Sequence, residues 1–421
     1  MFTPEKWDLA VKTFGPLLLV FLFSILLGGC AGISPEAPAA PLAKPVPPSA
    51  GNNPASTTEF IYSSNRSSTD TVGGSISGFT VDRQTGSLTP IPGFPLQARA
   101  PGLIVSDPQG RHLFHFENLF SGRGISCDDF KAVLVSDNID PHSGVLSHAD
   151  RVTLNDGCPG GMAVDPAGKN LYVVTPSDLS NIRVFAIASA GTLKEIPRAV
   201  SLDKQSAESL AMRPDGKFVY ATSGSGLGPG VMVLARDETT GGLALRQTVQ
   251  TAMELRNIAV SSDGTFVITT GIEYDFHTGF THGEVSVFRA SLSGELVLQS
   301  VLKYDHEPSG VEIDPSGKFA AITSFESVDI LPGEITIYHL DAATGSLTPA
   351  GPPLAVGHMP SELRFADEGK FIYSIISNDE LLAGFSFDKN SGSVTPLPQS
   401  PFKIEDFPAA FTIVRPEKGG N

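Results

Sequence analysis

A short phrase recurs along most of this chain: an apolar segment, then Asp-Pro-x-Gly or a close variant, then a second apolar segment. Successive turn glycines lie 58, 48, 48, 53 and 52 residues apart. This period is typical of a four-stranded propeller blade and is too long for a leucine-rich or ankyrin repeat. The six copies end at Gly110, Gly168, Gly216, Gly264, Gly317 and Gly369.

The residues before each turn glycine repeat an apolar pattern at strand period. The position six residues before the glycine is apolar in every copy, and the position four before it is apolar in all but one, where Ser106 stands. Residues two apart share one face of a strand, so this face is predicted to be buried. The position between them is Val or Ala in four copies but Glu312 and Arg364 in the others, which predicts structural partners or polar groups lining a channel.

A second repeated turn lies out of phase with the first and predicts a second set of hairpins. A glycine at the end of a short loop supplies the positive φ that such a hairpin needs. Seven outer hairpins then accompany six inner ones. The copies are Asp82 to Leu88, Asp341 to Leu347 and Asp388 to Val394, with Gly144, Gly191, Gly242 and Gly294 at the equivalent place in looser copies.

The mismatch in hairpin number resolves at the ends of the repeat. Phe407 to Val414 reads as an inner strand without a hairpin, and the segment that begins at Glu59 reads as a blade without its first strand. We predict that the last strand completes the first blade, which closes a seven-bladed, all-β propeller over residues 59–416. The 43 Gly and 33 Pro fit a turn-rich β-protein. Two smaller β-sandwiches are the alternative, which the uninterrupted repeat disfavours.

The N-terminal residues predict export. The apolar run from Leu17 to Leu27 is short for a membrane span and typical of a signal peptide, here residues 1–29. The sequence before Cys30 resembles the lipobox of bacterial lipoproteins, which implies lipidation of Cys30; an uncleaved anchor or an ordinary signal peptide is the alternative. Residues 30–58 predict a Pro/Ala/Ser-rich tether, and 417–421 a tail. We expect a monomer in a bacterial cell envelope, periplasmic or associated with the outer membrane, that touches the membrane only through its acyl chains.

Two further cysteines and the net charge indicate the redox compartment and the kinds of partner to expect. Cys127 and Cys158 are predicted to form a disulfide in an oxidising compartment, with two unpaired thiols as the alternative. The formal charge of −16 disfavours nucleic acid as a partner.

The candidate site residues gather in the loops that enter three consecutive inner segments. Ligands of propellers commonly meet this loop-rich face, so these residues are candidates for binding a protein, a glycan or a small molecule. The ligand-binding candidates are Glu254, Arg256, His306, Glu307, His358 and Glu362. A divalent metal is the one cofactor that the sequence suggests, through ligands of irregular spacing, and exposed histidines are the alternative. The metal candidates are His277, His282, His306 and Glu307.

The turns and outer hairpins resemble those of a known family. Pro-x-Gly-Lys turns followed by Phe-Val-Tyr or Leu-Tyr-Val, together with Thr-Gly-Ser-Leu-Thr-Pro hairpins, are similar to the seven-bladed lactonase propellers, which are 6-phosphogluconolactonase-like and include surface proteins with YVTN-type repeats. The resemblance covers Glu59 to Val414.

The resemblance also implies catalytic residues, which this chain lacks. Hydrolytic members are expected to carry Pro-His-x-His entering one blade, Gly-Pro-Arg-His entering the next, and an acidic residue after the following strand. The matching stretches here are Pro159 to Met162, Ala207 to Leu210 and Ala221 to Gly224, without the histidines, the arginine or that acidic residue. No catalytic residue is carried over.

Two hypotheses follow from these observations. The first is a lipid-anchored, non-catalytic propeller that binds its ligand on the loop-rich face. The second is a divergent hydrolase that acts on a lactone or sugar derivative. The first is favoured because a fold by itself is a weak argument for an activity.

Overall fold

The structure is a computed structural model that describes residues 58–67, 73–120, 130–154, 159–175, 181–197, 200, 202, 207–223, 228–274, 281–325, 331–404 and 407–416. The predicted signal peptide, tether and tail lie outside these residues, apart from Thr58, and so do Cys30, Cys127, Cys158 and His277. Within the described ranges, no helix is both long enough and apolar enough to cross a membrane.

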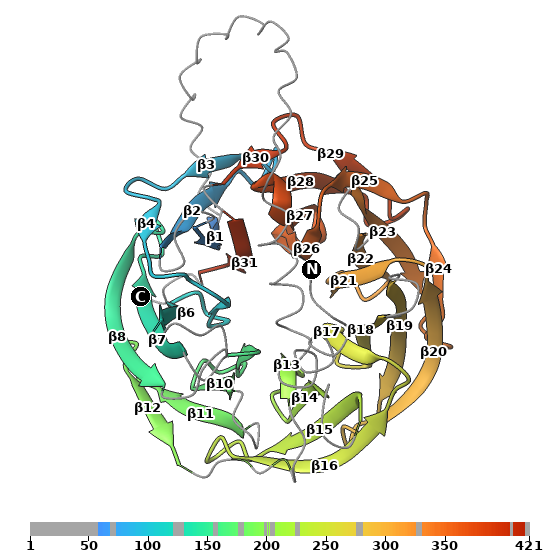
Figure 1. Ribbon diagram of the computed structural model, residues 1–421, viewed down its shortest axis with the longest axis horizontal. Coiled ribbons are helices and arrows are strands. Elements are labelled where there is room, and N and C mark those ends of the chain that lie inside the picture. Colours follow the sequence, from blue (N-terminus) through green and yellow to red (C-terminus); the bar gives the residue numbers. More distant parts are fainter. Residues whose placement is uncertain are drawn as a thin grey trace, which may run out of the picture. The chain divides into compact units, whose positions relative to one another are not determined.

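The strands form seven antiparallel sheets arranged as a ring (Figure 1). This confirms the predicted all-β, seven-bladed propeller. In each sheet one strand lies on the inner side of the ring and the others follow outward. The inner strands of blades 1 to 7 are β31 (Phe407–Val414), β5 (Ile104–Ser106), β9 (Met162–Val164), β13 (Ala207–Met212), β17 (Glu254–Val260), β21 (Glu307–Ile313) and β26 (Pro360–Ala366).

The second and third strands of each blade form its centre. The second strands are β1 (Glu59–Arg66), β6 (His112–Phe120), β10 (Asn170–Thr175), β14 (Phe218–Ser223), β18 (Phe266–Tyr274), β22 (Phe319–Phe325) and β27 (Phe371–Ile376). The third strands are β2 (Gly74–Val81), β7 (Phe130–Ile139), β11 (Asn181–Ile187), β15 (Gly230–Arg236), β19 (Thr281–Ala290), β23 (Gly333–Leu340) and β28 (Leu381–Phe387).

The outer strands differ most between blades, because three of them are split into two short segments. They are β3 (Leu88–Pro90) with β4 (Leu96–Gln97), β8 (Leu146–Leu154), β12 (Leu193–Ile196), β16 (Leu243–Gln250), β20 (Leu296–Tyr304), β24 (Leu347–Pro349) with β25 (Leu354–Gly357), and β29 (Val394–Pro396) with β30 (Phe402–Lys403). Two 3₁₀ turns, η2 (Asp367–Gly369) and η3 (Ser377–Asp379), flank β27.

The repeated Asp-Pro-x-Gly phrase is explained by the turn it forms between inner and second strands. The buried carboxylate of Asp314 accepts hydrogen bonds from the backbone N–H groups of Lys318 (2.8 Å) and Phe319 (2.7 Å), and Gly317 adopts a φ of 71°. A β-carbon is strained at this φ, so glycine recurs there. In the outer hairpin of blade 4, the predicted Gly242 is wrong. Gly241 has the positive φ of 75°, and sequence could not distinguish two adjacent glycines.

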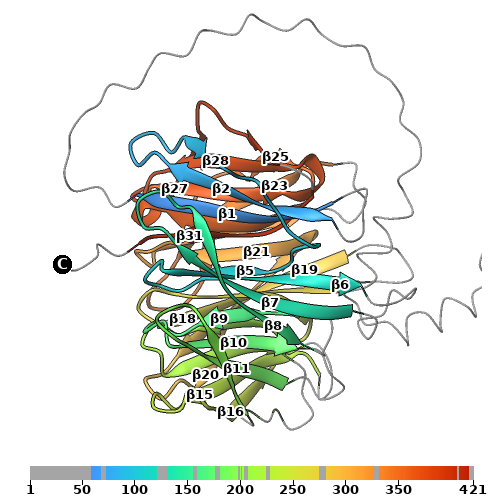
Figure 2. The same cartoon turned by 90° about the vertical axis from the view of Figure 1, so that its left-hand side faces the viewer.

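The ring closes through its two ends, as predicted. The C-terminal β31 pairs antiparallel with β1, with Ile61 opposite Ile413 and Ser63 opposite Phe411. Both views show β1, in blue, beside β31, in dark red (Figures 1 and 2). The Arg415 guanidinium also donates to the Glu59 carboxylate at 2.6 Å. Blade 1 is therefore built from both ends of the repeat.

The core lies between blades rather than at one centre. The buried apolar residues form seven clusters, each shared by two neighbouring blades. The cluster between blades 7 and 1 joins Phe371 and Tyr373 to Ile61 and Phe411. The Tyr373 hydroxyl crosses the same interface to donate to the Gly86 carbonyl. Each blade thus depends on both neighbours for burial of its two faces.

The closing strand supplies a test of this dependence. Replacing Phe411, which is 1 % exposed, with Ala should lower the free energy of unfolding by about 3–5 kcal/mol, because a cavity forms between blades 7 and 1. Guanidinium denaturation measures the effect. Thr412→Ala, on the other face of the same strand, should cost less than about 1 kcal/mol. Equal losses in both variants would contradict the proposed role of this interface.

Candidate functional site

Five inner strands carry an irregularity at the same level, close to where they begin. In each, the pairing with the second strand shifts, so that one or two residues stand outside the ladder. Such bulges redirect side chains and are frequent beside active sites. The bulged residues are Glu208 and Ser209 in β13, Arg256 in β17, Ser309 and Gly310 in β21, Ser361 and Glu362 in β26, and Ala409 in β31.

Hydroxyl groups of the second strands hold these bulges in place. Thr222 and Thr323 each lie six residues after a turn glycine. The Thr222 Oγ1 accepts from the backbone N–H of Ser209 at 3.0 Å, and the Thr323 Oγ1 accepts from that of Gly310 at 2.7 Å. The hydroxyl groups therefore replace the ladder hydrogen bonds that these backbone N–H groups lose at the bulges, which stabilises the irregular pairing.

The first charged cluster consists of Glu208, Glu254 and Arg256, on the inner strands of blades 4 and 5. The guanidinium of Arg256 lies 4.0 Å from the Glu254 carboxylate. Burial raises the pKa of Glu208 to about 7, with Arg256 opposing the shift and Glu254 adding to it. Burial also raises the pKa of Glu254, again against Arg256. The charge of Arg256 thus acts on two carboxylates and only partly offsets the effect of burial on their pKa values.

The second charged cluster consists of Glu312, Glu362 and Arg364, on the inner strands of blades 6 and 7. The Arg364 guanidinium lies 3.8 Å from Glu312 and 3.6 Å from Glu362. The Glu362 carboxylate also accepts from the backbone N–H of Phe411 at 3.2 Å, and the Arg364 guanidinium lies 5.8 Å from the centre of the Phe411 ring. The sequence-based pairing of Glu312 with Arg364 is correct, and this cluster helps to fix β26 against the closing strand.

The ion pairs of the two clusters are longer than the closest ion pairs elsewhere in the described chain. Arg183 and Glu195 approach to 2.6 Å, as do Arg415 and Glu59, whereas the pairs in the clusters span 3.6–4.0 Å. Direct N–H to carboxylate hydrogen bonds need distances near 2.7–2.9 Å. The first cluster therefore keeps hydrogen-bonding capacity that its members do not use on each other.

The position of Glu208 depends on the blade before it. A β-carbon on Gly160 would lie 2.7 Å from the Glu208 carbonyl oxygen, and one on Gly161 would lie 3.0 Å from the same atom. Strand entry in blade 3 thus packs directly on the bulge of β13. The stretches Pro159 to Met162 and Ala207 to Leu210 meet in space, but Gly160, Met162, Ser209 and Leu210 stand in place of the expected basic side chains.

The remaining predicted residues lie in or directly before strands of blades 5, 6 and 7. The side chain of His358 contacts the carboxylate of Asp379 at 2.9 Å. His282 is exposed on β19, and the next residue, Gly283, lies against the His306 carbonyl, since a β-carbon there would be 2.6 Å from this oxygen. Glu307 begins β21.

The predicted metal site stays a prediction. Among the described residues, no three His, Cys, Asp or Glu side chains are grouped so that they could hold a metal ion, and His277 lies outside these residues. His282 and His306 do come from neighbouring segments, as the sequence suggested.

Sequence reasoning missed Glu208 as a site residue. The signal was present, because Glu208 lies eight residues before Gly216 as Arg256 lies eight before Gly264. A comparison of the copies at this position would have placed the two side chains on neighbouring bulges.

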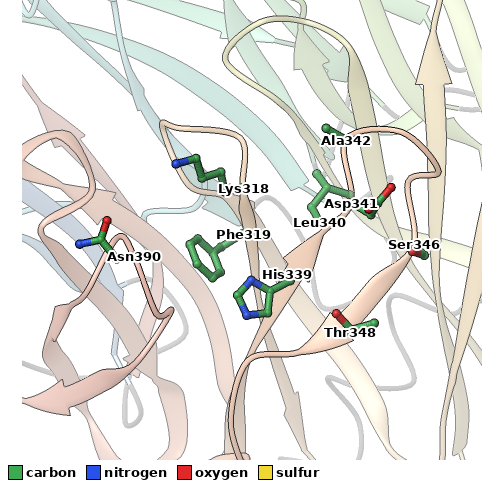
Figure 3. A pocket seen from close by; sticks show the side chains of 9 residues that line it. All are labelled: Lys318, Phe319, His339, Leu340, Asp341, Ala342, Ser346, Thr348 and Asn390. Carbon is green, nitrogen blue, oxygen red and sulfur yellow. The ribbon is translucent and has the colours of Figure 1, made fainter.

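A depression of about 390 Å³ lies at the turn end of blades 6 and 7, between the turn that holds Lys318 and the outer hairpins of Asp341 and Asn390 (Figure 3). Its wall includes Phe319 and His339. Inner strands end on this side, whereas the first cluster lies where they begin. None of the predicted site residues lines this depression.

The family of the chain follows from comparison with known proteins. The model of the family described as "Lactonase, 7-bladed beta-propeller" matches residues 138–281 and 284–405. The chain belongs to this family, which confirms the resemblance found in the sequence. The comparison with curated proteins gave no match.

Solved structures share the fold at low sequence identity. The periplasmic gluconolactonase PpgL of Pseudomonas aeruginosa is 20 % identical, with a TM-score of 0.66, and the alignment covers 85 % of this chain and 99 % of PpgL. A Bacteroides uniformis protein provisionally assigned as a 6-phosphogluconolactonase is 16 % identical, with a TM-score of 0.69 and coverage of 85 % and 100 %. A Lactobacillus plantarum protein is 15 % identical, with a TM-score of 0.67 and coverage of 85 % and 99 %.

The pKa of Glu208 gives a test of the first cluster. An unfolded Glu ionises near pH 4.3, so a carboxyl with a folded pKa of about 7 costs stability as the pH rises from about 4.3 to 7. Glu208→Gln removes this cost. We expect the variant to gain about 1–2 kcal/mol at pH 8 relative to its effect at pH 4, measured by denaturant unfolding. A gain of the same size at both pH values would contradict this assignment.

Proposed function

We propose that the protein binds a small molecule rich in hydroxyl groups at the first cluster, as a lipid-anchored propeller of the bacterial cell envelope. One observation supports this above the others: Glu208, Glu254 and Arg256 meet on bulged inner strands and leave donors and acceptors unused by each other. Carboxylates accept from hydroxyl groups and guanidinium groups donate to them, which suits a sugar or polyol.

The size of the ligand follows from the location of the cluster. The three side chains belong to the inner strands of only two blades, so they can bind a small group of ligand atoms but not a broad protein surface. The second cluster is less suited to this role, since Glu362 and Arg364 both contact Phe411 of the closing strand.

Removing Arg256 tests the binding proposal. Titration calorimetry with D-glucose, D-sorbitol, D-gluconate and D-glucono-δ-lactone should give binding of at least one compound. Arg256→Ala should weaken it at least about tenfold, which is about 1.4 kcal/mol. The control is Arg246→Ala, an exposed arginine on the outer strand of blade 4 that should not change the affinity. The proposal fails if none of the compounds binds or if both variants behave alike.

Lactone hydrolysis is a second candidate function, and the pKa of Glu208 near 7 favours it. A carboxylate with this pKa can take a proton from an attacking water, and Arg256 would stabilise the negative oxygen formed at the lactone carbonyl. The activity of PpgL, a gluconolactonase at 20 % identity, is consistent with such chemistry on this fold.

A hydrolysis screen separates the two functions. If the chain is a hydrolase of this kind, the rate of lactone hydrolysis should rise with pH, with an apparent pKa near 7. Glu208→Gln should abolish this activity. Repeating the screen with divalent metals, and with His306→Ala and Glu307→Ala, tests the predicted metal site. Binding without turnover in all arms supports the non-catalytic function.

A further inference from the structure

We propose that Glu208 makes the first cluster select a polyhydroxylated ligand that carries an ammonium group over one that carries a carboxylate or phosphate. The inference rests on the proposed function, because it names the ligand class of the same site. It depends on how Glu208 differs from the other acidic residues of the two clusters.

Glu208 is the one carboxylate of the two clusters for which the described part of the chain provides no hydrogen-bond donor and no ion pair. Glu362 accepts a hydrogen bond from the Phe411 backbone, Glu312 pairs with Arg364, and Glu254 pairs with Arg256. Within the described part of the chain, no group donates a hydrogen bond to the Glu208 carboxylate and no basic side chain forms an ion pair with it. Arg256 acts on it only through its charge.

The charge balance at the cluster favours a cation. Two carboxylates face one guanidinium, which leaves one negative charge when all three are ionised. Water is partly excluded, since burial is the main cause of the raised pKa of both Glu208 and Glu254. An ammonium group beside Glu208 would supply the missing partner and the donors that a carboxylate accepts. An anion would meet two carboxylates and would have to compete with them for Arg256.

The geometry holds Glu208 in place for this role. Its bulge is supported by the Thr222 hydroxyl on one side and by the close approach of Gly160 and Gly161 on the other. The carboxylate is therefore carried by a backbone that is fixed before the ligand arrives, which limits the entropy lost on binding.

Three acyclic six-carbon compounds that differ only at C1 provide the test. Glucamine carries an ammonium group, D-sorbitol a hydroxyl and D-gluconate a carboxylate. We expect calorimetry at neutral pH to show glucamine binding about tenfold more tightly than sorbitol, with gluconate the weakest. Glu208→Gln should abolish the difference between glucamine and sorbitol.

A matched variant and the ranking itself decide the outcome. Glu238→Gln changes an exposed glutamate on the outer hairpin of the same blade and should keep the preference for glucamine. Gluconate binding as tightly as glucamine, or a glucamine preference that persists in Glu208→Gln, overturns the inference and leaves the proposed function standing. Failure of all three compounds to bind overturns the inference, and the proposed function falls with it only when D-glucose and D-glucono-δ-lactone also fail to bind.

Discussion

The pairing of β31 with β1 is the contact on which the other six blades depend. A propeller has no single core, because each of its seven apolar clusters is shared by two neighbouring blades. Without β31, blade 1 would lose its inner strand, and the clusters with blades 7 and 2 would lose Phe411, Ala410 and Val414. The closure therefore completes burial on two interfaces at once and removes an open edge from the ring.

The same closure constrains where chemistry can take place. Glu362 and Arg364 carry the residue types of a binding site, but their contacts with Phe411 assign them to holding β26 against the last strand. Glu208, Glu254 and Arg256 belong to blades 4 and 5, each three blades away from blade 1, where the ring closes. Glu312, Glu362 and Arg364 thus have a structural role, whereas no direct hydrogen bond joins Glu208, Glu254 and Arg256 within the described residues.

The bulges link the fold to the site. A regular inner strand would send alternate side chains into the two neighbouring interfaces, where charge is costly. The strand pairing shifts around Arg256 and again around Glu208 and Ser209. The side chains of these residues therefore no longer follow the regular alternation between the two interfaces. Thr222 compensates the backbone group that the shift in β13 frees. Glu208 and Arg256 therefore lie outside the apolar clusters between blades.

The sequence by itself determined the blade count, the strand order and the closure, because the turn glycines and the apolar positions before them are set by local backbone geometry and by strand period. It also placed Glu254 beside Arg256, two residues along one strand. Only the tertiary structure decided that Glu208 joins them, that Glu362 turns to the closing strand and that His358 contacts Asp379. These contacts join residues 21 to 49 positions apart. Periodicity reports which face of a strand is buried, whereas the partner of a polar side chain depends on the register and bulges of neighbouring blades.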